Sequence, residues 1–354
     1  MQRPHGVLLL LLVLTASLLL FWNLEEAPLE RWDELTNINV VQETRSGGHL
    51  LPVLGGKPFL EKPPLWYLLT SALTSFTGDH LFWYRSVSAF SGLGCVLLLV
   101  LIVKRTHDIA SGLASGFTLL SVVHLFVPSV AGLFSSHTFR SADLDALQLF
   151  LLCAAWFVFR SEHKRKIAFT SILIGCAYLV KGPLALGLLG VCVFTLYRRR
   201  AELRTFAELV LPAAVLAGLW FCLMFKYTSG GIWDSYILYH QLARISGIEM
   251  HVEPVWFYIL ILAHPLTNPA ALPAGIAWLR SLKSGSLAAV SAAALLAGLS
   301  FILTKLSWYV FPVYILLALI TGRMYRQFAL PLQILLYVAV AAGILQSLWY
   351  VIRL

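Results

Sequence analysis

Eleven apolar segments, each between 14 and 23 residues long, constrain what this chain can fold into. They are residues 7–23, 84–103, 109–128, 144–159, 167–180, 183–197, 207–225, 256–278, 286–304, 308–322 and 329–350. A helix needs about 20 apolar residues to cross a bilayer, and about 17 when it is short. Charged residues make up 12% of the chain, against about 25% in soluble domains. The sequence therefore predicts an all-α polytopic membrane protein with about 10–11 transmembrane helices.

The charge of the connecting loops predicts the orientation of the chain. With Arg3 placed in the cytoplasm, the loops on that side hold 15 of the 26 Lys and Arg residues, but only four of the 17 Asp and Glu residues. Cytoplasmic loops of membrane proteins are enriched in Lys and Arg. We therefore expect an inner (plasma) membrane protein with a cytoplasmic N-terminus and an acidic periplasmic or extracellular face. Short basic clusters of this kind explain the pI of about 9.4 without a nucleic-acid partner.

Two outer loops stand out, at about 24–83 and 227–255. The first contains an apolar run, 65–76, that is too short to span and predicts an interfacial helix. All five cysteines lie in apolar segments, where packing explains them better than disulfides or metal binding. We expect one transmembrane domain over residues 1–354, without a soluble C-terminal domain.

Charged residues gather at six positions on the predicted outer side. They are Asp33 with Glu34, Glu61 with Lys62, Asp143 with Asp145, Lys181, His251 with Glu253, and Lys305. A carboxylate at the membrane surface can take a proton from an incoming hydroxyl, and cations bind phosphate. Acids that enter a membrane helix are costly and usually functional. The pattern favours a site for a lipid-linked anionic substrate.

Simpler explanations exist for each group. Asp33 could be a solvated loop acid, and Lys62 could place its ammonium group in the interface while its stem lies along apolar surface. Asp143 and Asp145 could form a packed ion pair with Arg140. The sequence leaves these alternatives open.

The order of motifs in the first loop is the most specific signal. Trp32-Asp33-Glu34 is followed by the stretch 48–67, in which Gly-Gly-Lys-Pro-Phe-Leu precedes Glu61-Lys62-Pro63-Pro64, and then by Phe82-Trp83-Tyr84-Arg85-Ser86. Together with the later groups, these motifs resemble the GT-C class of membrane glycosyltransferases. The resemblance is strongest to the lipid A aminoarabinose transferases and their protein O-mannosyltransferase relatives, and covers about residues 7–325.

This resemblance implies an inverting transfer of a sugar from a polyprenyl-phosphate donor to a lipid or protein acceptor, with no nucleotide cofactor. It implies that Asp33 activates the acceptor and that Asp145, with Asp143, supports it. The resemblance assigns donor phosphate binding to four cations: Lys62, Lys181, Arg244 and Lys305. Glu61 and His251 match positions that hold a divalent metal, zinc or magnesium, in the aminoarabinose transferases.

The sequence departs from the family at Leu35-Thr36-Asn37, where an alanine and an arginine or tyrosine are usual. Two other functions therefore stay open. A transporter or flippase for lipid-linked sugars predicts inverted repeats and polar residues near mid-span. A non-catalytic protein that binds such lipids would need Lys62 but would tolerate the loss of Asp33.

Overall fold

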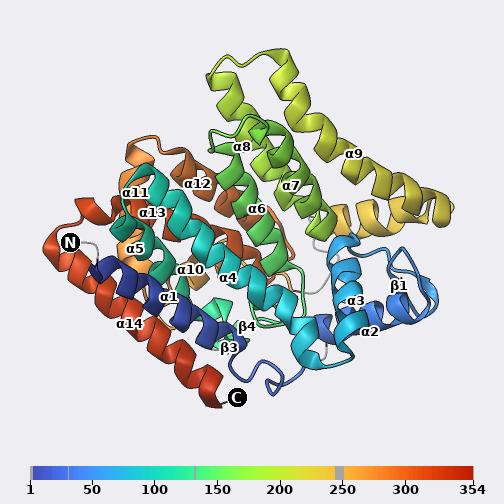
Figure 1. Ribbon diagram of the computed structural model, residues 1–354, viewed down its shortest axis with the longest axis horizontal. Helices are drawn as coiled ribbons and strands as arrows, with labels where there is room; N and C mark the ends of the chain where they lie inside the picture. Colours follow the sequence, from blue (N-terminus) through green and yellow to red (C-terminus); the bar gives the residue numbers. More distant parts are fainter. Residues whose placement is uncertain (1–2, 31, 131–132, 244–250, 354) are drawn as a thin grey trace. The chain divides into compact units, whose positions relative to one another are not determined.

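The computed structural model describes residues 3–30, 32–130, 133–243 and 251–353. Helices joined by short connections make up most of this part of the chain, with two small hairpins (Figure 1). Backbone contacts divide the chain into two compact units. The first comprises Met1–Pro28, Gly92–Arg140 and Arg244–Leu354, and the second comprises Leu29–Ser91 and Ser141–Ala243. The expectation of one transmembrane domain over residues 1–354 stays a prediction.

The first unit is built from helices of both chain ends. Its elements are α1 (Arg3–Phe21), most of α4 (Leu81–Thr106), α5 (Ile109–Leu120), η1 (Val123–Leu125), β3 (Ser129–Val130), β4 (Leu133–Phe134), α10 (Phe257–Ala263), α11 (Ala271–Lys283), α12 (Leu287–Phe301), η3 (Ser307–Val310), α13 (Phe311–Met324), η4 (Tyr325–Gln327) and α14 (Leu330–Arg353). Small residues let α5 and α13 approach closely: a Cβ on Gly322 would lie 2.7 Å from the carbonyl oxygen of Ser111.

The second unit holds the predicted first outer loop and four consecutive helices. Its elements are α2 (Asp33–Ser46), β1 (Val53–Leu54), β2 (Lys57–Pro58), α3 (Leu65–Thr77), the start of α4, α6 (Asp145–Phe159), α7 (Lys166–Lys181), α8 (Leu184–Arg198), α9 (Leu203–Tyr227) and the π-helical segment η2 (Trp233–Ala243). Helix α7 packs against α6, α8 and α9 (Figure 1). Gly175 permits the close approach to α9, because its added Cβ would lie 3.1 Å from the Cα of Ala213.

Local sequence explains the folding of the first loop. The hairpin of β1 and β2 turns at Gly55 and Gly56, whose φ angles of 61° and 70° suit glycine in a tight two-residue turn. Helix α3 begins directly after Pro63-Pro64 and corresponds to the predicted interfacial run. Most of its outward side chains are apolar, as at Leu69 and Phe76, whereas Thr70 and Thr74 are buried. Such a face suits contact with lipid.

Among the described residues, four helical segments are long and apolar enough to cross a bilayer. They are α4, α9, the stretch Ser307–Gln327, and α14. The pair α11 and α12, bent by 110°, would provide a fifth span if it counts as one. The predicted 10–11 crossings also require shorter apolar helices such as α1, α5, α6 and α8.

Two predicted segments differ clearly from the structure. Helix α5 ends at Leu120, although the predicted segment is 109–128. Residues 256–278 form two helices, α10 and α11, instead of one long helix. Pro265 and Pro269 lie between them, and proline lacks the N–H that a continuous helix needs. The apolar run alone concealed this break, because proline interrupts a helix without adding charge.

Candidate functional site

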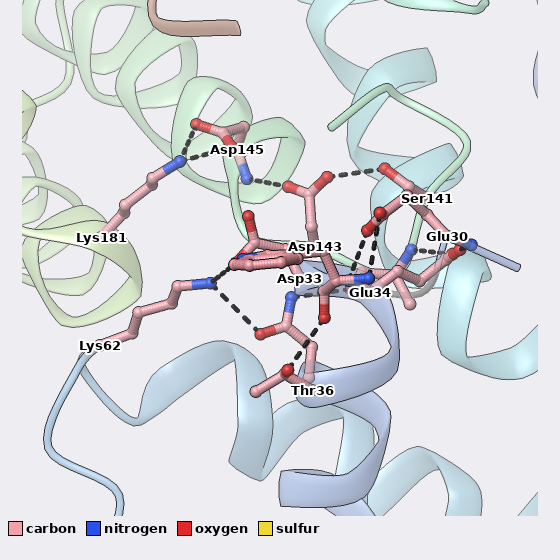
Figure 2. Close-up of polar contacts among 12 residues, drawn as sticks. Glu30, Asp33, Glu34, Thr36, Lys62, Ser141, Asp143, Asp145 and Lys181 are labelled. Carbon is pink, nitrogen blue, oxygen red and sulfur yellow. Dashed lines mark hydrogen bonds and ion pairs between the residues drawn. The ribbon is translucent and has the colours of Figure 1, made fainter. Parts of the chain in front are cut away.

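Asp33 and Lys62 form the first ion pair of the candidate site. Asp33 is the first residue of α2, and Lys62 lies in the connection that leads into α3. The Lys62 Nζ is 3.1 Å from Asp33 Oδ1, and both side chains are partly buried, with 14% and 25% of their surfaces exposed. Figure 2 shows Lys62 extending towards Asp33. Two residues that the sequence predicted for separate roles therefore lie together.

Asp145 and Lys181 form a second pair of the same kind. Asp145 begins α6 and Lys181 ends α7, and these two helices pack side by side. The Lys181 Nζ donates to both carboxylate oxygens of Asp145, at 2.6 and 2.5 Å (Figure 2). The negative charge of Asp145 also lies at a helix N-terminus, which favours it further.

Asp143 fixes the segment that leads into α6. Its Oδ2 accepts a hydrogen bond of 2.6 Å from Ser141 Oγ, and its Oδ1 accepts one of 2.8 Å from the backbone N–H of Asp145. The latter satisfies an amide at the helix start, where intrahelical partners are lacking. The fully buried Asp143 side chain thus holds the backbone at Asp145 in place.

Glu34 points in a different direction from its neighbour Asp33. Successive helical residues differ by about 100° around the axis. The Glu34 carboxylate accepts from Arg85 Nε at 2.7 Å and from a terminal Arg85 nitrogen at 2.9 Å. It also accepts from the backbone N–H of Ala142 at 2.7 Å. Because the two charged side chains are only 1% and 2% exposed, the pair is part of the buried framework.

Asn37 connects these groups and was missed by the sequence analysis. It lies one helical turn after Asp33, and therefore on the same face of α2. Its Oδ1 accepts from Tyr67 Oη at 2.7 Å and from Lys62 Nζ at 3.5 Å. Its Nδ2 donates to the carbonyl oxygen of Ala142 at 3.0 Å. The four-residue spacing from Asp33 was the one signal that could have indicated it.

Tyr67 remains a hydrogen-bond donor throughout the ordinary pH range. Burial, followed by the charges of Asp33, Glu61 and Asp143, raises the pKa of its hydroxyl well above the usual value. The protonated hydroxyl therefore always presents its hydrogen to Asn37.

Gly182 sets the end of α7 and with it the position of Lys181. Its φ angle is +81°, and a Cβ added there would lie 2.5 Å from Tyr236 Oη. Backbone in this region suits glycine and strains other residues. The requirement for glycine between α7 and α8 thus has a physical basis in the close approach of Tyr236.

Replacing Gly182 with alanine should destabilise the protein by about 1–3 kcal/mol, the usual cost of a strained backbone position. We expect a lower midpoint of thermal unfolding in detergent. The matched control is Gly187→Ala in α8, where an added Cβ meets nothing within 4 Å and alanine favours the helix. Equal midpoints for the two variants would contradict the role given to Gly182.

Comparison with known proteins places this geometry in context. No protein-family model matches the chain. The undecaprenyl phosphate-alpha-4-amino-4-deoxy-L-arabinose arabinosyl transferase of Shewanella sediminis is 25% identical over 240 residues, which cover 64% of this chain and 42% of that protein. The crystal structure of ArnT from Cupriavidus metallidurans bound to undecaprenyl phosphate has a TM-score of 0.76 at 18% identity, and the match covers 91% of this chain and 60% of that one. The chain has the ArnT fold.

A second solved structure extends the likeness. The oligosaccharyltransferase AglB of Archaeoglobus fulgidus, in complex with an inhibitory peptide and a dolichol-phosphate, matches with a TM-score of 0.58 at 12% identity, covering 99% of this chain and 56% of that one. These matches confirm the resemblance inferred from the motifs and the predicted fold class, and the chain is a multi-pass membrane protein. It spans less than half the length of the Shewanella relative.

The remaining predicted site residues are Lys305, His251, Glu61 and Arg244. Lys305 is buried in the first unit, where its Nζ donates to the carbonyl oxygen of Ile302 at 2.6 Å. Its backbone N–H donates to the carbonyl oxygen of His251 at 2.9 Å, so these two predicted residues are adjacent. Glu61 is an exposed residue of the second unit. Arg244 lies outside the described residues. Their assigned roles stay predictions.

Three side chains of metal-binding types fall within nine residues of the chain: His137, Asp143 and Asp145. His137 belongs to the first unit, and the aspartates belong to the second. Both aspartates already accept hydrogen bonds, but each carboxylate has about four acceptor positions, so further ligation is chemically feasible. The two aspartates are thus chemically suited to hold a divalent metal, and the assignment of Glu61 and His251 as metal ligands stays a prediction.

Proposed function

We propose that this protein is a membrane glycosyltransferase that moves a sugar from a polyprenyl-phosphate donor to a lipid or protein acceptor, with inversion at the anomeric carbon. The observation that carries the proposal is the pair of carboxylate–lysine contacts in one unit, Asp33 with Lys62 and Asp145 with Lys181. Such pairs combine a base for a hydroxyl with cations for a phosphate. The likeness to ArnT supports the choice of lipid donor.

The transfer is a single displacement. The acceptor oxygen forms a bond to C1 of the sugar while the bond between C1 and the phosphate oxygen breaks, and positive charge develops on the sugar ring. The acceptor proton passes to the Asp33 carboxylate. The electron pair of the broken bond leaves with the polyprenyl phosphate, whose charge the ammonium groups of Lys62 and Lys181 stabilise.

The other residues have supporting roles in this proposal. Asp145 holds Lys181 in place, and Asp143 holds Asp145 by accepting its backbone N–H. Arg244 and Lys305 are further candidates for the donor phosphate. A divalent metal held by the carboxylates would supply additional positive charge for the phosphate. The site faces the periplasmic or extracellular side of the inner membrane, as the loop charges predict.

The test uses purified protein in detergent, incubated with a lipid extract that contains polyprenyl-phosphate sugars. Mass spectrometry should show loss of the lipid-linked sugar and appearance of free polyprenyl phosphate. Lys62→Ala should slow this turnover at least about tenfold, since an interaction with a charged group contributes about 1.5–3 kcal/mol.

The matched control is Lys57→Ala, which removes an exposed lysine from strand β2 of the neighbouring hairpin. It should retain wild-type turnover. If the wild-type protein binds polyprenyl phosphate through Lys62 but never consumes the lipid-linked sugar, the proposal fails and a binding or transport function replaces it.

A further inference from the structure

We infer that Asn37 is a positioning residue that holds the Lys62 ammonium group ready for the donor phosphate, an inference that rests on the proposed function. Asn37 is fully buried and contacts three separate parts of the second unit. These are Lys62 in the connection before α3, Tyr67 in the first turn of α3, and Ala142 before α6.

The contacts fix the orientation of the Asn37 amide. The carbonyl oxygen of Ala142 can only accept a hydrogen bond, and the Lys62 ammonium group can only donate. If the amide oxygen and nitrogen were exchanged, the amide nitrogen would face the Lys62 ammonium group, which is also a donor. The amide oxygen would then face the carbonyl oxygen of Ala142, which is also an acceptor. The Tyr67 hydroxyl, held protonated by its raised pKa, reinforces the same orientation. Asn37 thus presents its oxygen to Lys62 in one arrangement only.

Neither aspartate nor leucine satisfies all three partners. Aspartate keeps an acceptor for Tyr67 and Lys62, but it lacks the N–H for Ala142. Leucine has nearly the same shape and leaves the Tyr67 hydroxyl and the Ala142 carbonyl without their partner, which is costly in a buried setting.

Positioning matters because a free lysine side chain has many rotamers. Binding of a phosphate would have to restrict them, at a cost in entropy. Here Asp33 and Asn37 approach the same Lys62 nitrogen, at 3.1 and 3.5 Å, so the ammonium group is already placed. The Asp33 carboxylate attracts the ammonium group by its charge. The neutral Asn37 fixes the position of the ammonium group without adding a negative charge that would repel the phosphate of the sugar donor.

The experiment measures two properties of the purified protein: modification of Lys62 by an amine-reactive reagent, followed by peptide mass spectrometry, and binding of undecaprenyl phosphate in detergent. In Asn37→Leu, Lys62 modification should rise about threefold and the dissociation constant should rise about tenfold, the scale of one hydrogen bond to a charged group. Turnover at saturating donor should change less than the donor KM. Asn37→Asp should keep the low modification rate and still bind the lipid more weakly, because its charge repels phosphate.

Tyr67→Phe is the second variant, since it removes one hydroxyl and conserves the ring, and it should give smaller changes in the same direction. The control is Ser71→Ala, because Ser71 also joins α3 to α2 by donating to the carbonyl oxygen of Val41. Both properties should stay at wild-type values in the control.

Unchanged Lys62 modification in folded Asn37→Leu and Tyr67→Phe would overturn the inference while leaving the proposed function intact. Failure of the wild-type protein to bind undecaprenyl phosphate would instead remove the proposed function, and with it the phosphate part of the inference.

Discussion

Asp33→Asn is expected to lower the rate of sugar transfer by about 10²- to 10⁴-fold, the usual contribution of a general base. Asparagine has the shape of aspartate and can still accept from Lys62, but it cannot take a proton from the acceptor hydroxyl. Donor binding should therefore persist or become tighter, because a negative charge near the phosphate is lost. The measurement is consumption of lipid-linked sugar under saturating donor, with binding of undecaprenyl phosphate followed in parallel.

Asp234→Asn serves as the matched control for this prediction. Asp234 is an exposed acid in η2 of the same unit, outside the candidate site. Its replacement removes the same charge and should leave the transfer rate unchanged. Full transfer by Asp33→Asn would remove Asp33 from the chemistry and would leave it as the ion-pair partner of Lys62.

The charged members of the site were predictable because their positions along the chain were unusual. Asp145 and Lys181 lie in or next to apolar segments, where charge is costly and therefore conspicuous. Asp33 and Lys62 lie in the loop 24–83, where the order of the motifs indicated them. Their pairing was not predictable. Lys62 follows Asp33 by 29 residues, and Lys181 follows Asp145 by 36, so the partners depend on how the helices pack.

Neutral and buried polar residues were harder to find. Asn37 and Tyr67 carry no charge, and neither residue type is unusual in a loop with helical segments. Glu34 looked like a second site acid beside Asp33, since the sequence does not show which side of α2 faces inward. Only the contact with Arg85, 51 residues later, shows that Glu34 belongs to the framework.

The helices themselves followed from the apolar segments, and most boundaries were close. Segment 207–225 became α9 (Leu203–Tyr227), and segment 329–350 became α14 (Leu330–Arg353). The prediction of one helix over 256–278 was wrong, because hydropathy does not register the missing N–H of proline. Periodicity and turn chemistry therefore carry information that mean hydropathy discards.

Arg85→Met is expected to reduce the free energy of unfolding by about 3–5 kcal/mol, because it leaves the buried Glu34 carboxylate without its cation. Both side chains are almost fully buried, so water cannot replace the lost contact. The measurement is the midpoint of thermal unfolding in detergent. The comparison variant is Arg204→Met, which breaks an exposed pair with Glu208 and should cost at most about 1 kcal/mol.

The double variant Glu34→Gln with Arg85→Met decides whether charge or packing dominates. Glutamine retains an oxygen for the backbone N–H of Ala142 and carries no charge, so the double variant should be more stable than Arg85→Met alone. A double variant no more stable than Arg85→Met would assign the loss to the packing of the arginine side chain instead. In the proposed transferase, Glu34→Gln should also retain transfer per folded molecule, in contrast to Asp33→Asn, because Glu34 faces the framework and Asp33 faces Lys62.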